Sequence, residues 1–160
     1  MDDNILAWNK KINQNIISLS METTKKVLYT AKVHTTGGRA NGVAKSDDGH
    51  LNIKLSTPGT GRAGTNPEQL FAGGWSACFE GAMDIVANKL RITLPVDTAI
   101  DAEVDLCLTG MDFSLQARLN ISLPGMSMEV AQRLVDLSHQ TCPYSKAIKG
   151  NVDVKTTITV

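Results

Sequence analysis

The stretch Thr65–Ala82, which reads TNPEQLFAGGWSACFEGA, constrains the fold more than any other part of the chain. Asn66 is a good N-cap residue, and Pro67 has its φ preset for the first helical position. Glu68 adds a negative charge near the positive end of the helix dipole. A helix is therefore predicted to start at this point and to run to about Lys89.

Two adjacent glycines interrupt the apolar pattern of this predicted helix. Gly73 and Gly74 lower helix stability, so they predict either a kink or a close backbone approach by another segment. Beyond them, apolar residues recur at helical spacing on one broad face, which includes Cys78. That face consists of Trp75, Cys78, Phe79, Ala82, Ile85 and Val86.

The composition excludes several classes of partner. The 160 residues are enough for one domain, and 42% hydrophobic residues are enough for a substantial core. Sixteen basic and sixteen acidic residues cancel, so neither a nucleic acid nor a membrane is expected as a partner. The N-terminus has acidic residues where a signal peptide has basic ones, and no apolar run is of transmembrane length, which predicts a cytoplasmic protein.

The first residues form a separate segment of the chain. Residues 1–20 place apolar side chains at steps of three and four, which predicts an amphipathic helix. We therefore predict an N-terminal extension over residues 1–22 and one domain over residues 23–160.

The next part of the chain predicts an antiparallel meander. Residues 26–36 alternate apolar and polar side chains, as a half-buried strand does. Two glycines and then Arg39 follow, and Asn41-Gly42 is a strong signal for a hairpin turn. A third alternating segment covers residues 51–56. Arg39 is thus placed on a turn, where by position alone it would be an ordinary solvated arginine.

The alternation returns after the long helix. Residues 99–108 and 113–123 each alternate with a period of two, which predicts a hairpin of long strands. One face of this hairpin is apolar and expected to be buried, whereas the other is acidic. Cys107 lies on the acidic face in mid-strand, so it is interpreted as structural.

The C-terminal part predicts a helix, a second cysteine motif and a closing strand. Ser127 is expected to start a helix that ends near His139. Cys142 precedes Pro143, a plausible first residue of a short helix, and a thiolate is favoured at such a helix start. The last residues, 152–160, are rich in β-branched side chains and predict the final strand.

Several chemistries fit the cysteines and histidines. A buried cysteine on an apolar helix face, such as Cys78, is most often a small hydrophobic residue. His139 and Cys142 form an HxxC pair, but no second close pair completes a zinc site. A Cys-His hydrolase is possible, although no nucleophile-elbow sequence surrounds Cys78. Its histidine would be His34, His50 or His139.

Four sequence blocks carry a family resemblance. They are GTNPEQLFAGGWSACFEGA around Cys78, TCPYSKAIKGN around Cys142, TTGGRANG around Arg39, and DGHLNIKLSTP. These blocks, in their order along the chain, closely resemble the organic hydroperoxide resistance (Ohr) branch of the Ohr/OsmC family. The resemblance covers Lys25 to Val160, and residues 1–20 lie outside it.

The resemblance implies an α+β fold in which antiparallel sheets wrap around long central helices in an intertwined homodimer. It implies a cysteine-based peroxidase of the oxidative stress response that reduces organic hydroperoxides to alcohols. Cys78 would be the peroxidatic cysteine and Cys142 the resolving one, while Arg39 holds the thiolate and Glu68 holds Arg39. A dihydrolipoyl group on a lipoylated partner protein would be the reductant, with no bound cofactor and no metal.

The aromatic residues near Cys78 are a further expectation. Phe71, Trp75 and Phe79 are predicted to line an apolar substrate pocket, although they fit an ordinary core as well. The competing function is a non-enzymatic thiol protein that responds to redox conditions or binds a hydrophobic ligand. Turnover of a hydroperoxide would separate the two.

Overall fold

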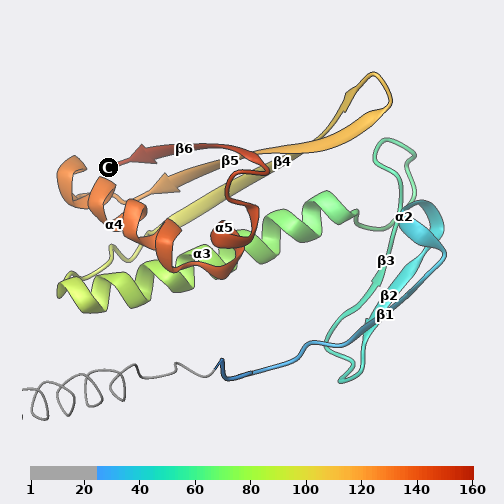
Figure 1. Cartoon of the computed structure of the whole chain (residues 1–160), viewed down its shortest axis with the longest axis horizontal. Helices are drawn as coiled ribbons and strands as arrows, with labels where there is room; N and C mark the ends of the chain where they lie inside the picture. The colour runs from blue at the N-terminus through green and yellow to red at the C-terminus, as the bar shows by residue number, and fades with distance from the viewer. Residues whose placement is uncertain (1–24) are drawn as a thin grey trace, which may run out of the picture. The chain divides into compact units, whose positions relative to one another are not determined.

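The structure is a computed structural model, and it describes residues 25–160. The chain divides into two units, residues 1–32 and residues 33–160. The helix predicted for residues 1–20 lies outside the described residues. Residues 25–32 have no regular secondary structure, and all described helices and strands belong to the second unit (Figure 1).

The first strand is much shorter than predicted. β1 covers only Val33–Thr36, whereas the alternation predicted a strand over residues 26–36. Val33 pairs with Ser46, the last residue of β2 (Val43–Ser46). The chain then turns, so β2 offers no further backbone groups for the residues before Val33. The prediction was wrong because side-chain alternation does not report how long the neighbouring strand is.

The meander itself is present, with a different first turn. β1, β2 and β3 (Asn52–Lys54) form an antiparallel sheet in that order. A one-turn helix, α2 (Gly38–Asn41), joins β1 to β2, so the tight Asn-Gly turn that we predicted is wrong. Gly37 precedes this helix with φ 74°, and a Cβ there would lie 2.9 Å from the Cα of Gly42. The connection therefore requires glycine, and it carries Arg39 at the end of the sheet.

The predicted long helix is observed without a break. α3 spans Pro67–Leu90, and the side chain of Asn66 accepts a hydrogen bond of 2.9 Å from the backbone N–H of Gln69. Gly74 does not kink the helix. Instead, a Cβ at Gly74 would lie 3.2 Å from the Oη of Tyr144, so this glycine makes room for another segment. Of the two outcomes predicted for the glycines, close approach is confirmed.

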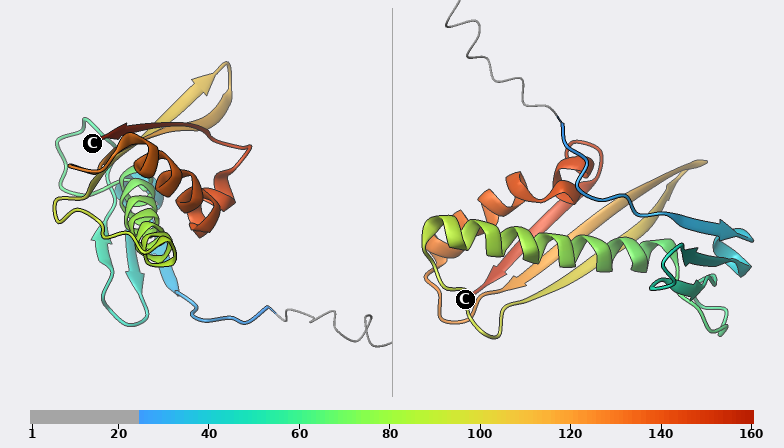
Figure 2. Two further views of the ribbon diagram at one scale, coloured as in Figure 1. Left: turned by 90° about the vertical axis from the view of Figure 1, so that its left-hand side faces the viewer. Right: turned by 90° about the horizontal axis from the view of Figure 1, so that it is seen from below.

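The second sheet is built on the predicted hairpin. β4 (Ala99–Thr109) and β5 (Asp112–Ser122) are antiparallel, and the closing strand β6 (Asp153–Thr159) lies parallel to β5. Between β5 and β6 the chain forms α4 (Met128–Thr141) and α5 (Pro143–Ile148). α3 and α4 lie side by side on the same face of this sheet (Figure 2).

The core lies between these helices and the sheet. α3, β5 and α4 supply most of its fully buried side chains, and Cys142 belongs to the same cluster. The largest of them are Trp75, Phe79, Met83, Leu119, Ile121, Leu123, Leu134 and Val135. The predicted α+β class is confirmed. No helix in residues 25–160 is long and apolar enough to cross a bilayer.

The two faces of the β4–β5 hairpin differ from the simple prediction. On the outer face Arg118 bonds Glu103 and Asp105 at 2.7 Å. The bonds that Asp105 accepts from Arg118 and from Gln116 lower its pKa to about 2. The acidic face is thus partly neutralised. On the inner face, Leu106 and Phe113 are 42% and 66% exposed, because the core reaches only as far along β4 as Val104. The expectation of one fully buried face was wrong for this end of the hairpin.

Candidate functional site

Two free thiols from distant parts of the sequence meet beside α3. The Sγ of Cys78, on α3, lies 3.5 Å from the Sγ of Cys142, although 64 residues separate them. Cys142 is completely buried, and Cys78 is partly exposed. A disulfide has an S–S length of about 2.05 Å, so the two sulfurs need to approach by only about 1.5 Å to form one.

The position of Cys142 follows from local structure. Its backbone N–H donates to the carbonyl of Ser138 at 2.8 Å, which ties it to the end of α4. Its Sγ accepts a hydrogen bond of 3.5 Å from the backbone N–H of Ser145, so Cys142 is the N-cap of α5. Pro143 follows at the first helical position, as the sequence predicted. The sulfur is thus fixed by both helices.

Contact between α5 and α3 completes the setting of the thiols. Tyr144 lies over Gly74, and its ring centroid is 6.2 Å from that of Phe71. Trp75 is fully buried in the core, and its ring centroid lies 5.9 Å from that of Phe71. Phe79 is also fully buried. Within this chain, Trp75 and Phe79 are therefore core residues, and their predicted role in a substrate pocket stays a prediction.

The electrostatic setting of Cys78 favours the thiol over the thiolate. Burial is the largest cause, and it raises the pKa of Cys78 above its ordinary value. A backbone hydrogen bond from Tyr144 acts in the opposite direction, while the neighbouring Cys142 raises the pKa further. A nucleophilic Cys78 thus needs a positive charge, and no cation among residues 25–160 acts on its pKa.

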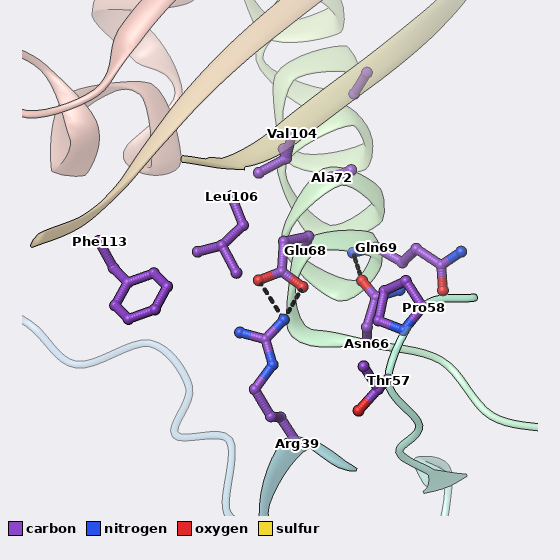
Figure 3. Close-up of a pocket in the computed structure, with 11 residues that line it drawn as sticks. Arg39, Thr57, Pro58, Asn66, Glu68, Gln69, Ala72, Val104, Leu106 and Phe113 are labelled. Atoms are coloured by element: carbon purple, nitrogen blue, oxygen red, sulfur yellow. Dashed lines mark hydrogen bonds and ion pairs between the residues drawn. The ribbon is translucent and has the colours of Figure 1, made fainter. Parts of the chain in front are cut away.

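A second pair of residues meets at the start of α3. The Nη2 of Arg39 donates to both carboxylate oxygens of Glu68, at 3.0 and 2.9 Å (Figure 3). Because one nitrogen makes both bonds, the other two guanidinium nitrogens are not used by Glu68. The Arg39 side chain is 43% exposed, so it is held in place without being enclosed. The predicted charge pairing between turn and helix start is observed.

The Arg39–Glu68 pair borders a cavity of about 660 Å³. Its other walls come from the loop before α3, from the first turns of α3 and from the exposed end of the β4–β5 hairpin. Leu106 and Phe113 point toward the arginine from that hairpin (Figure 3). We did not predict these two as site residues. The available signal was that the apolar alternation of the hairpin continues past the part that α3 covers.

The structure does not bring the two pairs together within one chain. Glu68 and Cys78 are on the same continuous helix, 78 − 68 = 10 residues apart. At 1.5 Å and 100° per residue, they are separated by about 15 Å along the axis and by roughly 80° around it. In addition, helical side chains lean toward the N-terminus, so Glu68 leans away from Cys78. The Arg39 that Glu68 holds therefore does not reach the Cys78 of the same chain.

Cys107 takes no part in either pair. It is partly exposed in mid-strand on β4, opposite Ser114 of β5, and it is a free thiol. Among residues 25–160, no group of three or more His, Cys, Asp or Glu side chains is arranged to hold a metal ion. The site therefore consists of two thiols and, separately, one arginine–glutamate pair.

This fold and its adjacent thiols define a class of proteins, the OsmC-like proteins. The family model described as OsmC-like protein matches residues 57–157. The chain belongs to the organic hydroperoxide resistance branch of the Ohr/OsmC family, as the sequence resemblance predicted.

Curated relatives and solved structures support this assignment. The chain is 48% identical over 142 residues to the organic hydroperoxide resistance protein of Xanthomonas axonopodis pv. citri, covering 86% of this chain and 99% of that protein. A crystal structure of an organic hydroperoxide resistance protein from Legionella pneumophila has a TM-score of 0.79 at 43% identity, covering 84% of this chain and all of that one. OhrB of Bacillus subtilis has a TM-score of 0.77 at 43% identity, covering 83% of this chain and all of that one. The predicted OsmC-like fold is thereby confirmed.

Proposed function

We propose that this protein is a cysteine-based peroxidase that reduces organic hydroperoxides to alcohols. The observation that carries the proposal is the 3.5 Å distance between the sulfurs of Cys78 and Cys142. A thiol that attacks a peroxide becomes a sulfenic acid, and a second thiol at this distance captures it before further oxidation. The names of the relatives, organic hydroperoxide resistance proteins, support organic peroxides as the substrate class.

The proposed reaction has three steps. The Cys78 thiolate attacks one peroxide oxygen, the O–O bond breaks, and the alkoxide leaves as an alcohol after taking a proton. The resulting Cys78 sulfenic acid then condenses with the thiol of Cys142, which forms a disulfide and releases water. Finally, a dithiol reduces the disulfide by exchange and becomes a disulfide itself. We propose a dihydrolipoyl group on a partner protein of the cytoplasm as this dithiol, with no cofactor bound to the enzyme.

The first step needs a cation beside Cys78, and we propose that Arg39 of a second copy supplies it. Burial holds Cys78 as a thiol, and the Arg39 of the same chain is held at the far end of α3 by Glu68. In a twofold symmetric dimer, each chain would bring its Arg39–Glu68 pair to the thiols of the other, which gives two equal sites. The unused nitrogens of Arg39 would then contact the thiolate and the peroxide.

The exposed surface of α3 supports the proposed homodimer. Ile85 is 51% exposed, and small residues lie on the solvent side of the same helix near Cys78. Those small residues are Gly73, Ala77 and Gly81. The end of the β4–β5 hairpin adds Leu106, Leu108 and Phe113 to the exposed apolar surface. A second chain that covers both regions would bury apolar surface beside the thiols and exclude water from them.

The cavity beside Arg39 supports a preference for alkyl hydroperoxides. Val104, Leu106 and Phe113 make its wall largely apolar, and Arg39, paired with Glu68, lies opposite them. An alkyl tail would bury against this wall while the peroxide group meets the guanidinium. Hydrogen peroxide has no such tail and gains nothing from the wall. The same wall is the observation that favours the alternative function, a hydrophobic-ligand-binding thiol protein.

Steady-state turnover tests the proposal. Purified protein should consume cumene hydroperoxide and a fatty-acid hydroperoxide when dihydrolipoamide is supplied, and much less when glutathione or thioredoxin replaces it. Hydrogen peroxide should be a poorer substrate than either organic peroxide. If the protein binds the peroxide without consuming it under any reductant, the ligand-binding alternative holds instead.

A further inference from the structure

A chain of hydrogen bonds runs from the buried core to the surface behind the resolving cysteine. The indole Nε1 of Trp75 donates to the Oγ of Ser145 at 3.0 Å. The same Oγ lies 3.3 Å from the Nδ1 of His139, and the Nε2 of His139 lies 3.2 Å from the Oγ1 of Thr156. The four residues come from α3, α5, α4 and β6 in turn. This chain joins four elements around Cys142 and is not used by the steps proposed above.

The donors and acceptors of this chain can be assigned from chemistry. An indole N–H only donates, so the Ser145 hydroxyl oxygen is an acceptor toward Trp75. Among the described residues the only other partner of this oxygen is the Nδ1 of His139, so we assign the hydroxyl hydrogen to that bond and leave Nδ1 without a proton. The neutral imidazole therefore has its hydrogen on Nε2 and donates it to Thr156. Burial lowers the pKa of His139, against a smaller opposing effect of Asp136, which agrees with a neutral ring.

The position of the His139 ring is fixed by packing. Its centroid lies 4.6 Å from that of Phe79, with the two rings edge to face. Phe79 is fully buried and lies on α3, one residue after Cys78. The ring therefore has little freedom to turn away from Ser145.

Ser145 connects the His139 ring to the sulfur of Cys142. Its side chain is held by Trp75 and His139, while its backbone N–H donates to the Sγ of Cys142 at 3.5 Å. α5 has only six residues, and a helix of that length is not stable by itself. The direction of the Cys142 sulfur toward Cys78 therefore depends on the contacts that hold the first turn of α5.

We infer that His139 is a positioning residue for the resolving step, acting through Ser145 on Cys142. This inference rests on the proposed peroxidase function. Without the acceptor on His139, the Ser145 hydroxyl loses one of its two fixed partners, and the first turn of α5 is less well held. The Cys78 sulfenic acid then waits longer for Cys142 and is overoxidised more often. The attack of Cys78 on the peroxide is unchanged, because His139 bonds neither sulfur nor Arg39.

Two substitutions of His139 test the roles of its two ring nitrogens separately. His139→Asn places a carbonyl oxygen near the former Nδ1, so it keeps the acceptor for Ser145 and loses the bond to Thr156. His139→Gln places its amide near the former Nε2, so it keeps the bond to Thr156 and loses the acceptor. We expect His139→Gln to resolve about tenfold more slowly than the wild type, the factor of one lost hydrogen bond. His139→Asn should stay close to the wild-type rate.

Ser138→Ala is the matched control. It also removes a buried hydroxyl from α4, but that hydroxyl bonds the carbonyl of Leu134 in its own helix at 2.7 Å. Ser145→Ala is the second test variant, because it removes the centre of the hydrogen-bond chain and keeps the backbone N–H that faces Cys142. It should resolve as slowly as His139→Gln.

The experiment follows one turnover of each reduced protein with one equivalent of cumene hydroperoxide. Peroxide loss measures the first step, and dimedone trapping with mass spectrometry measures the lifetime of the sulfenic acid and the sulfinic product. The inference is overturned if folded His139→Gln or Ser145→Ala resolves at the wild-type rate. It is also overturned if the first step slows by the same factor as the second. A wild type that forms no sulfenic acid at all would instead refute the proposed function.

Discussion

The thiol pair and the arginine–glutamate pair are built in different ways. Cys78 and Cys142 are held by α3, α4 and α5, next to fully buried core residues. Arg39 is held by a four-residue helix between two short strands, and it is 43% exposed. The described residues of one chain therefore bring the two thiols together, but they do not bring Arg39 to those thiols. In the mechanism that we propose, resolution would be a property of one chain and activation a property of two.

The largest expected effect comes from breaking the thiol pair. Cys78→Ser should reduce turnover by several orders of magnitude, because the nucleophile is lost. Cys142→Ser should still reduce one equivalent of peroxide, and Cys78 should then become overoxidised. Non-reducing peptide mapping of the wild type after one equivalent of peroxide should find a Cys78–Cys142 disulfide. A link between Cys78 and Cys107 would contradict the assignment.

The next effect tests whether activation comes from the second chain. Arg39→Ala should raise the pKa of Cys78 and slow peroxide attack by roughly a hundredfold or more, because a charged donor to the transition state is lost. Stopped-flow rates and thiol titration measure the two changes.

A mixed dimer makes the same test sharper. Cys78→Ser alone should be inactive and Arg39→Ala alone strongly slowed, but one chain of each, co-refolded, should restore one fast site. That site takes Cys78 from the Arg39→Ala chain and Arg39 from the Cys78→Ser chain. If both residues of a site came from one chain, the mixture would gain no fast site.

A smaller effect is expected at Glu68. Glu68→Ala removes the group that orients Arg39 and leaves the cation, so peroxide attack should slow by about tenfold. Glu68→Gln is the control, since it keeps one oxygen as an acceptor. The double variant with Arg39→Ala should be no slower than Arg39→Ala alone, because the glutamate then has nothing to orient. Penalties that simply add would count against a coupled pair.

The smallest effect concerns the pH dependence of stability around the thiol pair. Burial lowers the pKa of His139 from 6.5 in the folded protein, so the unfolded chain binds a proton at a higher pH than the folded one does. The free energy of unfolding should therefore fall as the pH drops below about 6.5, and it should level off below the folded pKa. Urea denaturation of the wild type and His139→Asn measures this. The expected loss on acidification is larger for the wild type, and equal losses would contradict it.

Much of the local structure could be predicted from sequence, because it depends on neighbouring residues. The start of α3 at Asn66 and Pro67 follows from capping, and β4 and β5 follow from their alternation. The predictions were wrong where a segment distant in sequence decides how far a strand extends or which side chains are covered. β1 begins opposite the last residue of β2, and the apolar face of the hairpin is uncovered beside the start of α3.

In the candidate site, too, some features follow from neighbouring residues and others depend on distant elements. The turn position of Arg39 and the helix-start position of Cys142 could be read from the residues around them. The hydrogen-bond chain through Ser145 and His139 could not, because it needs Trp75 and Thr156 from other elements. Gly74 is intermediate: the sequence indicated a close approach, but only the structure identified Tyr144 as the neighbour.

By itself, the sequence determined most of the helices and strands and their order, since capping and periodicity act over a few residues. The family resemblance added the roles expected of Cys78, Cys142, Arg39 and Glu68. Only the tertiary structure decided that the two sulfurs lie 3.5 Å apart across 64 residues. It also decided that Glu68 and Cys78 are separated by ten residues of rigid helix, a distance of about 15 Å. The physical reason is that such distances are set by the packing of elements that are distant in sequence, and local sequence patterns do not predict that packing.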